Sequence, residues 1–367
     1  MTPDPVVAVP PAAMEDWLAA IYTAAGCPVP EARMIAEHLV EADLSGHPSH
    51  GIVRTPRYLD WIENGTLRRS GTLAVLNDGA GFALLDGCSS FGQVTGHAVV
   101  ERAEAMVRAG GIAVIGLRRG GHLGRIGAWA ERLADRGLVS VSFVNVAGSR
   151  LVAPFGAAER GFSTAPVTVG VPHHTPDGTT DHFILDFATS RIAEGKALVA
   201  VKRGGTLRGD AFVTPEGADS ANPRTLYGDS VDSAVPNPRG GPGALQAMGD
   251  HKGSGLALAC ELLAGALTGG GTNRDPEPPF GNGWLLVALD PARFDTDGGF
   301  ANEVSAFIAH IRSLRPRDAD EPVMIPGDPE RRRRARFAHG LPLETGLIAA
   351  LRQAGEALGV EPPGFAA

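Results

Sequence analysis

The densest group of residues able to do chemistry lies in the segment Gly46–Gly51, a Gly-His-Pro-Ser-His-Gly stretch. Histidine exchanges protons near neutral pH, so His50, with Ser49 before it, is a candidate for general acid–base catalysis. Arg54 follows four residues later, and its planar guanidinium suits a carboxylate. Tyr58 lies four residues further and would share a helical face with Arg54. A proton donor beside a carboxylate-binding arginine is what a 2-keto or 2-hydroxy acid requires; the alternative is a solvated loop whose arginine pairs with a surface acid.

A third histidine, His122, lies in the glycine-rich segment 120–127, between an apolar stretch and a helical pattern. Ligands of α/β proteins bind at the sheet edge where strands pass into helices, so His122 is a second candidate for proton transfer. The glycines have the spacing GxxGxxG, and the chain lacks a GxGxxG between an early strand and a helix. We therefore expect no Rossmann-type dinucleotide loop, although the helix start after Gly124 could hold an anion.

Two further segments contain residues that could contact a cofactor. Asp186 ends an apolar strand pattern and precedes a turn of small residues. Its carboxylate would orient a histidine, contact a cofactor hydroxyl or cap the next helix. His251 and Lys252 open an apolar helical pattern beside Gly253, and a lysine among glycines at a helix start can bind phosphate groups.

A metal site is the main alternative use of these residues. A metal-dependent hydrolase would take its ligands from His47, His50, His122 and Asp186. The first two histidines lie on a loop rather than a helix, which does not secure ligand geometry. The three cysteines are far apart in the sequence, so neither a cysteine zinc site nor a disulfide framework is expected.

Composition limits the classes of protein that fit. The chain has 367 residues, of which 43% are hydrophobic and 20% charged, so it can fill a sizeable core. The 33 basic and 41 acidic residues give a net charge of −8, which argues against a general nucleic-acid-binding protein. The run Arg331–Arg334 is predicted to be a solvated helix face rather than an RNA or membrane patch. No apolar stretch resembles a signal peptide or a membrane span, so we expect a cytoplasmic protein.

Apolar periodicity predicts the elements that position these residues. Helices are predicted at 12–25, 30–43, 55–63, 92–109, 124–136, 192–202, 251–267, 302–314 and 344–358, with another starting at Pro329. Strands are predicted at 73–76, 82–85, 112–117, 138–144, 167–171, 182–187 and 284–289. The alternation of strands and helices indicates an α/β layer, for which a parallel sheet is the first expectation. Residues 205–243, rich in glycine and proline, are predicted to be a loop that lines the site rather than a flexible linker.

Six blocks, in order along nearly the whole chain, resemble the malate/L-lactate dehydrogenase family that is unrelated to the Rossmann dehydrogenases. They are Ser49-His50-Gly51 with Arg54 and Tyr58, Gly121-His122-Leu123-Gly124, Ala153-Pro154-Phe155-Gly156, Asp186-Phe187-Ala188-Thr189-Ser190 with Gly195-Lys196, His251-Lys252-Gly253-Ser254-Gly255-Leu256, and Ile325-Pro326-Gly327-Asp328. The family includes ureidoglycolate, sulfolactate and diketogulonate oxidoreductases and cyclic-imine carboxylate reductases. Any one block is weak, whereas six in order are specific.

The resemblance implies an α/β (α+β) fold of the non-Rossmann type, with a mainly antiparallel central sheet and flanking helical regions. This replaces the first expectation of a parallel sheet. It further implies NAD or NADP as cofactor, no metal, and a homodimer whose active site lies at the subunit interface. Residues 1–72 with 315–367 would form a helical domain with dimer and substrate contacts. Residues 73–200 with 245–314 would bind the nicotinamide, and 201–244 would form the glycine- and proline-rich loop.

The resemblance also implies roles for single residues at matching positions. Arg54 would bind the substrate carboxylate, and Ser49, His50 and Tyr58 would line the pocket. His50 and His122 match the two histidines credited as proton donor in different members, and Asp186 would support a catalytic histidine or contact the cofactor. Segments that contact the cofactor match Asp186, Phe187, Ala188, Thr189, Ser190, His251, Lys252, Gly327 and Asp328.

The implied reaction passes a hydride between nicotinamide C4 and C2 of a small 2-keto or 2-hydroxy acid, with histidine moving the proton. The chain departs from the family at Ala165, where an asparagine is usual, which leaves the substrate open. Reduction of a cyclic imine carboxylate is one alternative. A metal-dependent hydrolase and a non-catalytic small-molecule-binding protein are alternatives of other classes. The choice between NAD and NADP and the direction of reaction are left open as well.

Overall fold

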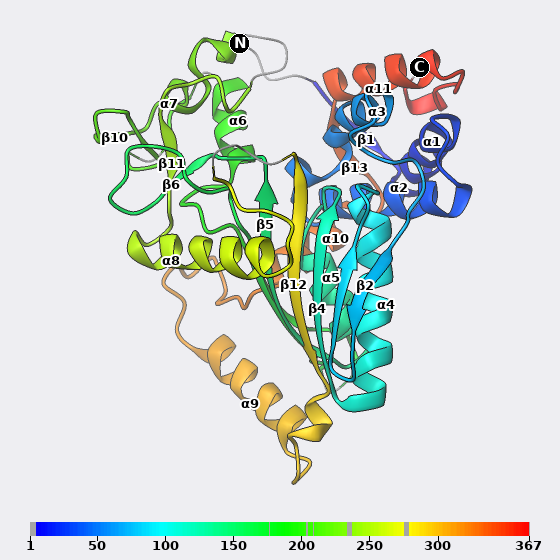
Figure 1. The fold of residues 1–367 in the computed structure, drawn as a ribbon, viewed down its shortest axis with the longest axis vertical. Coiled ribbons are helices and arrows are strands. Elements are labelled where there is room, and N and C mark those ends of the chain that lie inside the picture. The colour runs from blue at the N-terminus through cyan, green and yellow to red at the C-terminus, as the bar shows by residue number, and fades with distance from the viewer. Residues whose placement is uncertain are drawn as a thin grey trace.

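The centre of the protein is a seven-stranded sheet, seen in a computed structural model that describes residues 5–175, 177–202, 205–207, 209–232, 237–274 and 279–366. Its strand order is β2-β3-β4-β12-β5-β7-β8 (Figure 1). The strands are β2 (Ala74–Asp78), β3 (Phe82–Asp86), β4 (Ile112–Gly120), β12 (Gly281–Leu289), β5 (Val139–Ala147), β7 (Val167–Val171) and β8 (Phe183–Phe187). The β3–β4 pair is parallel and the other five pairs are antiparallel. The mainly antiparallel sheet is therefore confirmed, and the parallel sheet suggested by alternation alone is wrong.

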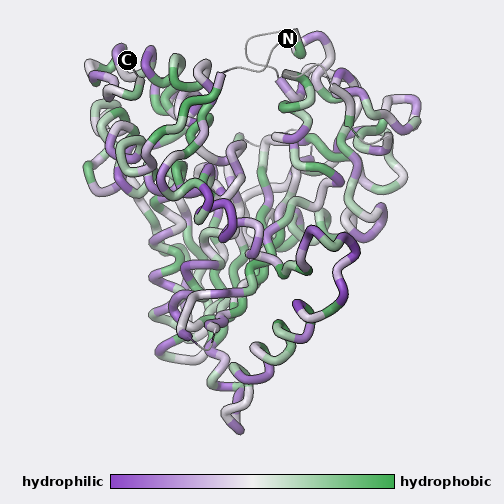
Figure 2. Tube along the Cα trace, turned by 180° about the vertical axis from the view of Figure 1, so that it is seen from behind, coloured by the Kyte–Doolittle hydropathy of each residue, from purple (hydrophilic) through white to green (hydrophobic). Residues whose placement is uncertain are grey.

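Two helices cover the sheet and supply its core. Helix α4 (Gly92–Gly110) packs against β4, and α5 (Gly127–Ala134) packs against β7. The helix predicted at 92–109 buries one apolar stripe, with Val99, Ala103 and Val107 packed against strand residues. Figure 2 shows hydrophobic residues concentrated along the central strands. The apolar period of this helix thus marks the face that meets the sheet.

The two ends of the chain meet in a helical region. Strand β1 (Val6–Val9) pairs antiparallel with β13 (Leu341–Glu344). Helices α1 (Pro11–Ala24), α2 (Val29–Leu44) and α3 (Thr55–Glu63) share one hydrophobic core with α11 (Thr345–Ala357). Helix α10 (Asp328–Phe337) lies against α2, and a short 3₁₀ turn, η6 (Gly364–Ala366), follows α11. Both ends of the chain thus contribute to the region that contains α3.

A smaller sheet lies beside the main one, with strand order β10-β9-β11-β6. Its strands are β6 (Val152–Ala153), β9 (Phe212–Val213), β10 (Asp219–Ser220) and β11 (Ala244–Gln246). Helices α6 (Glu194–Lys202) and α7 (Arg224–Tyr227) and the 3₁₀ turn η3 (Gly228–Asp232) accompany them, and Phe212 and Tyr227 are fully buried. The segment 205–243, predicted to be a loop, therefore contains short elements in the part that the structure describes. The proposed division into domains stays a prediction.

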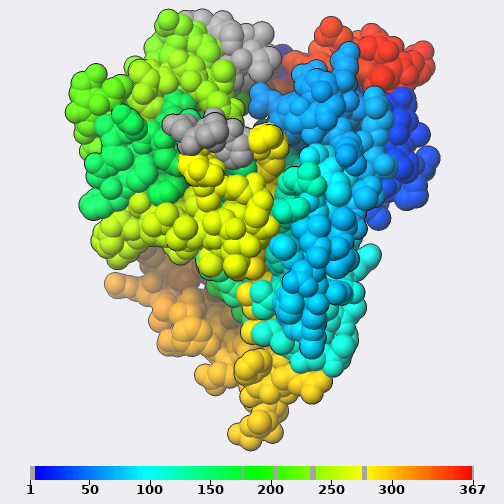
Figure 3. All heavy atoms as spheres, in the orientation of Figure 1, coloured from blue at the N-terminus to red at the C-terminus, as the bar shows by residue number. Residues whose placement is uncertain are grey.

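The helix predicted at 251–267 has two parts. Helix α8 (His251–Cys260) continues into a π-helical segment, η4 (Glu261–Ala266), where Glu261 turns inward and its carboxylate accepts hydrogen bonds from Asn273 N and Nδ2 at 2.9 and 2.8 Å. After β12 and the turn η5 (Pro291–Arg293), helix α9 (Phe300–Ser313) extends from the body with Ile308 as its buried residue (Figures 1 and 3). In the described part of the chain, no helix combines the length and apolar character that crossing a membrane requires.

Candidate active site

The loop that carries Ser49, His50 and Arg54 consists of two 3₁₀ turns, η1 (Pro48–His50) and η2 (Ile52–Arg54). Asp43, at the end of α2, accepts a hydrogen bond from the Ile52 backbone N–H at 2.7 Å. A side chain at Gly51 is excluded, because its Cβ would lie 1.9 Å from Asp43 Oδ2. Glycine therefore lets the loop pack closely against Asp43, and this contact fixes the position of the loop that carries His50 and Arg54.

His122 and Tyr58 meet although 64 residues separate them in the chain. The Tyr58 hydroxyl lies 2.5 Å from His122 Nδ1, and the Gln93 amide Nε2 donates to the same hydroxyl at 3.1 Å. The Tyr58 ring is buried and packs edge-on against Phe91, with ring centroids 5.7 Å apart. Helix α3 supplies Tyr58, and the loop after β4 supplies His122. The structure therefore joins two of the residues that the sequence had placed in separate motifs.

His50 completes this cluster. Its ring stacks on His122 with centroids 5.4 Å apart, and its Nδ1 lies 2.9 Å from Ser49 Oγ. The Arg54 Nε–H donates to the Ser49 carbonyl, which holds the guanidinium beside the histidines. Of the six residues predicted to bind substrate or transfer its proton, the five other than Asp186 thus lie in one cluster. Gln93 is an addition that no sequence motif indicated.

Both histidines of the cluster are held neutral. Burial, followed by the charge of the nearby Arg54, lowers the pKa of His50 to about 3. Burial, followed by the charge of Arg54, lowers the pKa of His122 well below its usual value. Within the described residues, Arg54 forms no ion pair with a carboxylate. A carboxylate bound by Arg54 would offset this positive charge and make a proton on either histidine less costly.

Asp43 gives the loop a dependence on pH. Burial raises the pKa of Asp43 to about 7, although the hydrogen bond from Ile52 opposes the change. Since the folded pKa lies above that of an unfolded aspartate, the contribution of Asp43 to stability is lost as pH rises through about 7. We expect Asp43→Asn, which keeps an acceptor for Ile52, to gain stability over wild type as pH rises from 5 to 8. Urea unfolding at the two pH values measures this; equal differences at both would contradict it.

Asp186 lies at the start of a different helix from the one expected. Its Oδ2 accepts a hydrogen bond from the backbone N–H of Gly127, the first residue of α5, at 2.7 Å. A carboxylate at a helix N-terminus is favourable, and the helix that follows Asp186 in sequence is α6 instead. Burial raises the pKa of Asp186, while the charges of His47 and Arg125 lower it. Among described residues its hydrogen bond goes to this backbone rather than to a histidine, so its role in catalysis stays a prediction.

The turn after Asp186 joins two other predicted segments. The Thr189 backbone N–H donates to Thr164 O, and the Met248 N–H donates to Thr189 O, both at 2.9 Å. Ser190 forms an isolated bridge with Ala247. The turn therefore lies between the segment containing Ala165 and the start of α8. Phe187 packs against the small core around Ala165, and Ala188 is partly exposed.

The start of α8 presents exposed groups that suit an anion. His251 and Lys252 are both exposed there, and the Phe155 ring packs edge-on against His251 at 5.9 Å. A side chain at Gly156 or Gly255 would meet no atom within 4 Å, so the backbone is open to a close approach. A helix N-terminus, a lysine and accessible backbone together fit the pyrophosphate of a dinucleotide.

Ala165 has an unusual backbone. It is fully buried and has a φ of 36°, a left-handed conformation that glycine and asparagine adopt more easily than alanine. The asparagine usual at the matching position of the resembling family would suit this backbone as well as offer an amide. Alanine at this position therefore lacks both the amide group of asparagine and its tolerance of a left-handed backbone.

Gly327 and Asp328 lie in an ion-paired cluster. Asp328 accepts hydrogen bonds from Arg312 and Arg331, each at 2.7 Å, and from the Ile325 backbone N–H at 2.8 Å. Gly327 has a φ of 101°, and a Cβ there would come within 3.0 Å of the His182 carbonyl. These contacts give both residues a structural role. Their contact with a cofactor stays a prediction.

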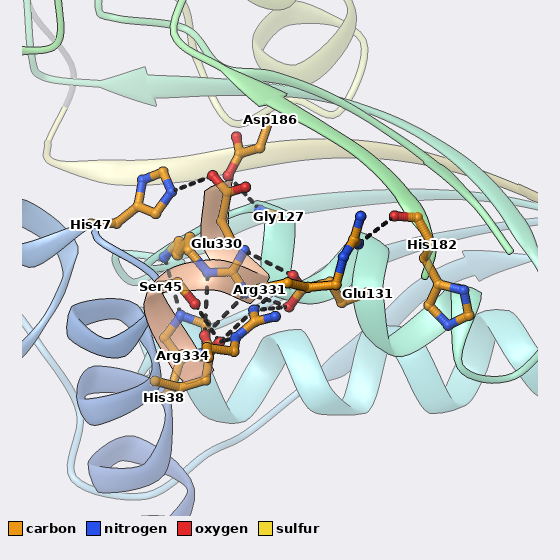
Figure 4. A network of polar contacts seen from close by, with 12 residues as sticks. His38, Ser45, His47, Gly127, Glu131, His182, Asp186, Glu330, Arg331 and Arg334 are labelled. Atoms are coloured by element: carbon orange, nitrogen blue, oxygen red, sulfur yellow. Dashed lines mark hydrogen bonds and ion pairs between the residues drawn. The ribbon is translucent and has the colours of Figure 1, made fainter. Parts of the chain in front are cut away.

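A partly buried ionic network includes Arg125, in the turn that follows His122, and Figure 4 shows polar contacts of this network. The Arg125 side chain is buried, and its guanidinium donates to Glu41 at 3.0 Å and to Glu131. Arg334 bonds the same two carboxylates, at 2.6 and 2.7 Å. His47, from the loop before His50, lies 3.2 Å from Glu330. The network joins α2, α5 and α10 around the turn that follows His122.

The predicted solvated face 331–334 is therefore only partly correct. Arg332 and Arg333 are exposed, whereas Arg331 and Arg334 form ion pairs with acidic residues distant in sequence. Within the part of the chain that the structure describes, no group of three or more histidine, cysteine, aspartate or glutamate side chains is arranged to hold a metal ion.

Comparison with known proteins places the chain among dehydrogenases. The sequence model of the malate/L-lactate dehydrogenase family matches residues 9–352. The chain is 32% identical over 356 residues to hydroxycarboxylate dehydrogenase B of Escherichia coli strain K12, covering 95% of this chain and 93% of that protein. The solved malate dehydrogenase of Pyrococcus horikoshii has a TM-score of 0.82 and 27% identity, covering 97% of both chains. The δ1-piperideine-2-carboxylate reductase of Pseudomonas syringae has a TM-score of 0.79 and 28% identity, covering 95% of this chain and 99% of that one.

Proposed function

This chain belongs to the malate/L-lactate dehydrogenase family of oxidoreductases, and on that premise we propose that it reduces or oxidises a small 2-keto or 2-hydroxy acid with NAD(H) or NADP(H). The observation that carries the proposal is the contact of Tyr58 with His122 beside His50 and Arg54. It combines a group that can transfer a proton with a cation that can hold a carboxylate.

The residues of this cluster divide the work of the reaction. Bound nicotinamide supplies or accepts a hydride at its C4 atom. Arg54 binds the substrate carboxylate and thereby orients the adjacent carbon. His122 donates a proton to the carbonyl oxygen during reduction, or removes it from the hydroxyl during oxidation. Tyr58 and Ser49 hold the rings of His122 and His50 in place through their hydroxyl groups.

The cofactor would lie along the turn Asp186–Ser190 and the start of α8. Lys252 and the helix N-terminus would bind its phosphates, and open backbone at Gly156 and Gly255 would allow close approach. Thr189 and Met248 connect these two segments by a backbone hydrogen bond. Gly327 and Asp328 are further candidates for cofactor contact, as is His251.

Replacing Arg54 tests carboxylate binding. We expect Arg54→Lys to raise KM for a 2-keto acid by roughly 10-fold and Arg54→Met by roughly 100-fold, because each charge-assisted hydrogen bond contributes about 1.5–3 kcal/mol. Steady-state kinetics with saturating cofactor measure both values. An unchanged KM in Arg54→Met would place the carboxylate elsewhere.

A cyclic imine carboxylate is the second candidate substrate. The similarity in sequence and fold to a piperideine-carboxylate reductase supports it. An imine is easily protonated, so its reduction would ask less of a histidine whose pKa is far below neutrality. The carboxylate would still bind to Arg54, so both candidates use the same site.

We also propose that the enzyme works as a homodimer in the cytoplasm, with the active site at the subunit interface. Leu258 and Leu262, one turn apart on α8 and η4, are exposed, and so is Phe307 on α9. Exposed apolar residues gathered on one helix, as Leu258 and Leu262 are, are typical of interfaces. Light scattering is expected to give a mass of twice the 38.0 kDa of one chain. The double variant Leu258→Asp, Leu262→Asp should lower the measured mass to that of one chain. A wild-type mass of one chain at micromolar concentration would contradict the proposal.

The direct test is oxidation of NADH and of NADPH against a panel of 2-keto acids and cyclic imine carboxylates. We expect turnover with one cofactor preferred and with at least one acid, and none with the matching ketones that lack a carboxylate. Titration of nicotinamide fluorescence with the protein tests cofactor binding separately. Absence of both binding and turnover would contradict the proposed function.

A further inference from the structure

Gln93 lies behind the candidate catalytic pair, on the first turn of α4. Its side chain is fully buried, and its Nε2 donates to the Tyr58 hydroxyl at 3.1 Å. Its Oε1 is buried and has no hydrogen-bond partner among the residues that the structure describes. Burying an amide with one of its two ends unsatisfied lowers stability, which indicates that the end facing Tyr58 has a role in the site.

The contact from Gln93 determines the direction of the next hydrogen bond. A tyrosine hydroxyl has one hydrogen to donate, and in this site its oxygen already accepts from the Gln93 amide. Among the described residues, the acceptor within reach of its own hydrogen is His122 Nδ1, 2.5 Å away, and donating to it satisfies the hydroxyl fully. Since a neutral imidazole has one N–H and Nδ1 acts as the acceptor, the proton of His122 is on Nε2.

We propose that Gln93 is a positioning residue that, through Tyr58, holds His122 with its proton on Nε2 and supports a proton relay during reduction. This rests on the proposed function, in which His122 serves the substrate. Nε2–H is the donor that a substrate carbonyl or imine requires. The second nitrogen is then free to receive a replacement proton from Tyr58.

The relay balances in protons and charge. A bound reduced nicotinamide would supply the hydride for the substrate carbon, and His122 Nε2–H gives its proton to the substrate oxygen or nitrogen. The Tyr58 proton moves to Nδ1 along the 2.5 Å contact, which leaves His122 neutral and Tyr58 as a phenolate. Burial raises the pKa of Tyr58 to about 12, whereas the charge of Arg54 and the hydrogen bond from the Gln93 amide act in the opposite direction and reduce the cost of the phenolate. Water later returns a proton to Tyr58.

The test compares three variants of the full-length protein, labelled with ¹⁵N in the histidine rings and free of ligand. Loss of the His122 signals in His122→Gln assigns them. Wild type should show a pyrrole-type Nε2 and a pyridine-type Nδ1. In Gln93→Glu the carboxylate can only accept, so Tyr58 must donate to it and accept from Nδ1–H, which reverses the two shifts. Gln353→Met, at an exposed glutamine of α11, is the matched control and should change nothing.

Kinetics provide the second measurement. Gln93→Met keeps the side-chain size and removes the donor to the phenolate. We expect it to lower the single-turnover rate of reduction by roughly 10- to 100-fold, as loss of a hydrogen bond to a developing charge does, with KM within about twofold of wild type. Circular dichroism shows whether each variant is folded. If Gln93→Glu does not fold, the rate of Gln93→Met alone tests the proposal.

Three results would overturn the proposal: a pyrrole-type Nδ1 in wild type, unchanged shifts in folded Gln93→Glu, or a wild-type rate in Gln93→Met. Failure of the proposed function looks different. In that case the shifts would follow the expected pattern, while no acid or imine would be reduced by either nicotinamide cofactor.

Discussion

Replacing His122 by Gln is expected to lower kcat by about 10²–10⁴, which is the usual contribution of a general acid–base group. Gln has a similar size and retains a polar end, but it cannot transfer a proton. Helix α3 and the Arg54 side chain stay in place, so KM should change little. Steady-state kinetics at saturating cofactor, with folding checked by circular dichroism, give the result.

His50→Gln is the matched comparison. His50 stacks on His122 and bonds Ser49, and it lacks the direct contact with Tyr58 that supports a proton relay. We expect its kcat to fall by less than that of His122→Gln. A larger loss in His50→Gln would exchange the roles of the two histidines, and wild-type rates in both variants would remove both from the mechanism.

Replacing Arg125 by Met is expected to destabilise the protein by about 1–3 kcal/mol, the usual cost of removing one partner of a hydrogen-bonded group. The two carboxylates that it binds, Glu41 and Glu131, are partly exposed and would then share Arg334 among the described residues. Urea unfolding followed by tryptophan fluorescence measures the change in unfolding free energy.

Arg33→Met serves as the control for this loss. Arg33 pairs with Asp16 at 2.7 Å, but both side chains are more than half exposed, so solvent screens the pair and it contributes little to stability. A loss in Arg125→Met no larger than that in Arg33→Met would contradict a stabilising role for the network. Activity of the folded fraction of Arg125→Met would report whether the network also positions the His122 loop.

Local patterns predicted single elements well. The helix predicted at 55–63 matches α3, and the helix predicted at 302–314 lies within one or two residues of α9. Both have a clear apolar period or sharp boundaries, such as the Asn64-Gly65 turn after α3. The short strands of the smaller sheet were missed because strands of two or three residues show no apolar period.

Order in space was beyond the reach of local patterns. Strand β12 inserts between β4 and β5, although it follows β4 by about 160 residues, and this insertion makes the sheet antiparallel. Alternation of strands and helices gives no information about such an insertion. The resemblance to a family supplied the sheet type that the pattern itself predicted wrongly.

The candidate site shows the same division. His50, His122, Arg54 and Tyr58 could be chosen because their types are reactive and their motifs are distinctive. Gln93 and Arg125 have no motif, and their importance comes from partners that are 35 and 84 residues away. Only folding brings those partners close, so only a structure could add them.

The pairing of β1 with β13 has a consequence for synthesis on the ribosome. Residues 341–351 complete the core that α1, α2 and α3 begin, so the first helices emerge about 300 residues before the strand and helix that cover them. Until residues 341–351 have been made, the apolar faces of α1 and α2 lack that cover, although all seven strands of the central sheet have already been made. The core of the helical region is therefore completed after the central sheet, although α1 and α2 are made before any strand of that sheet.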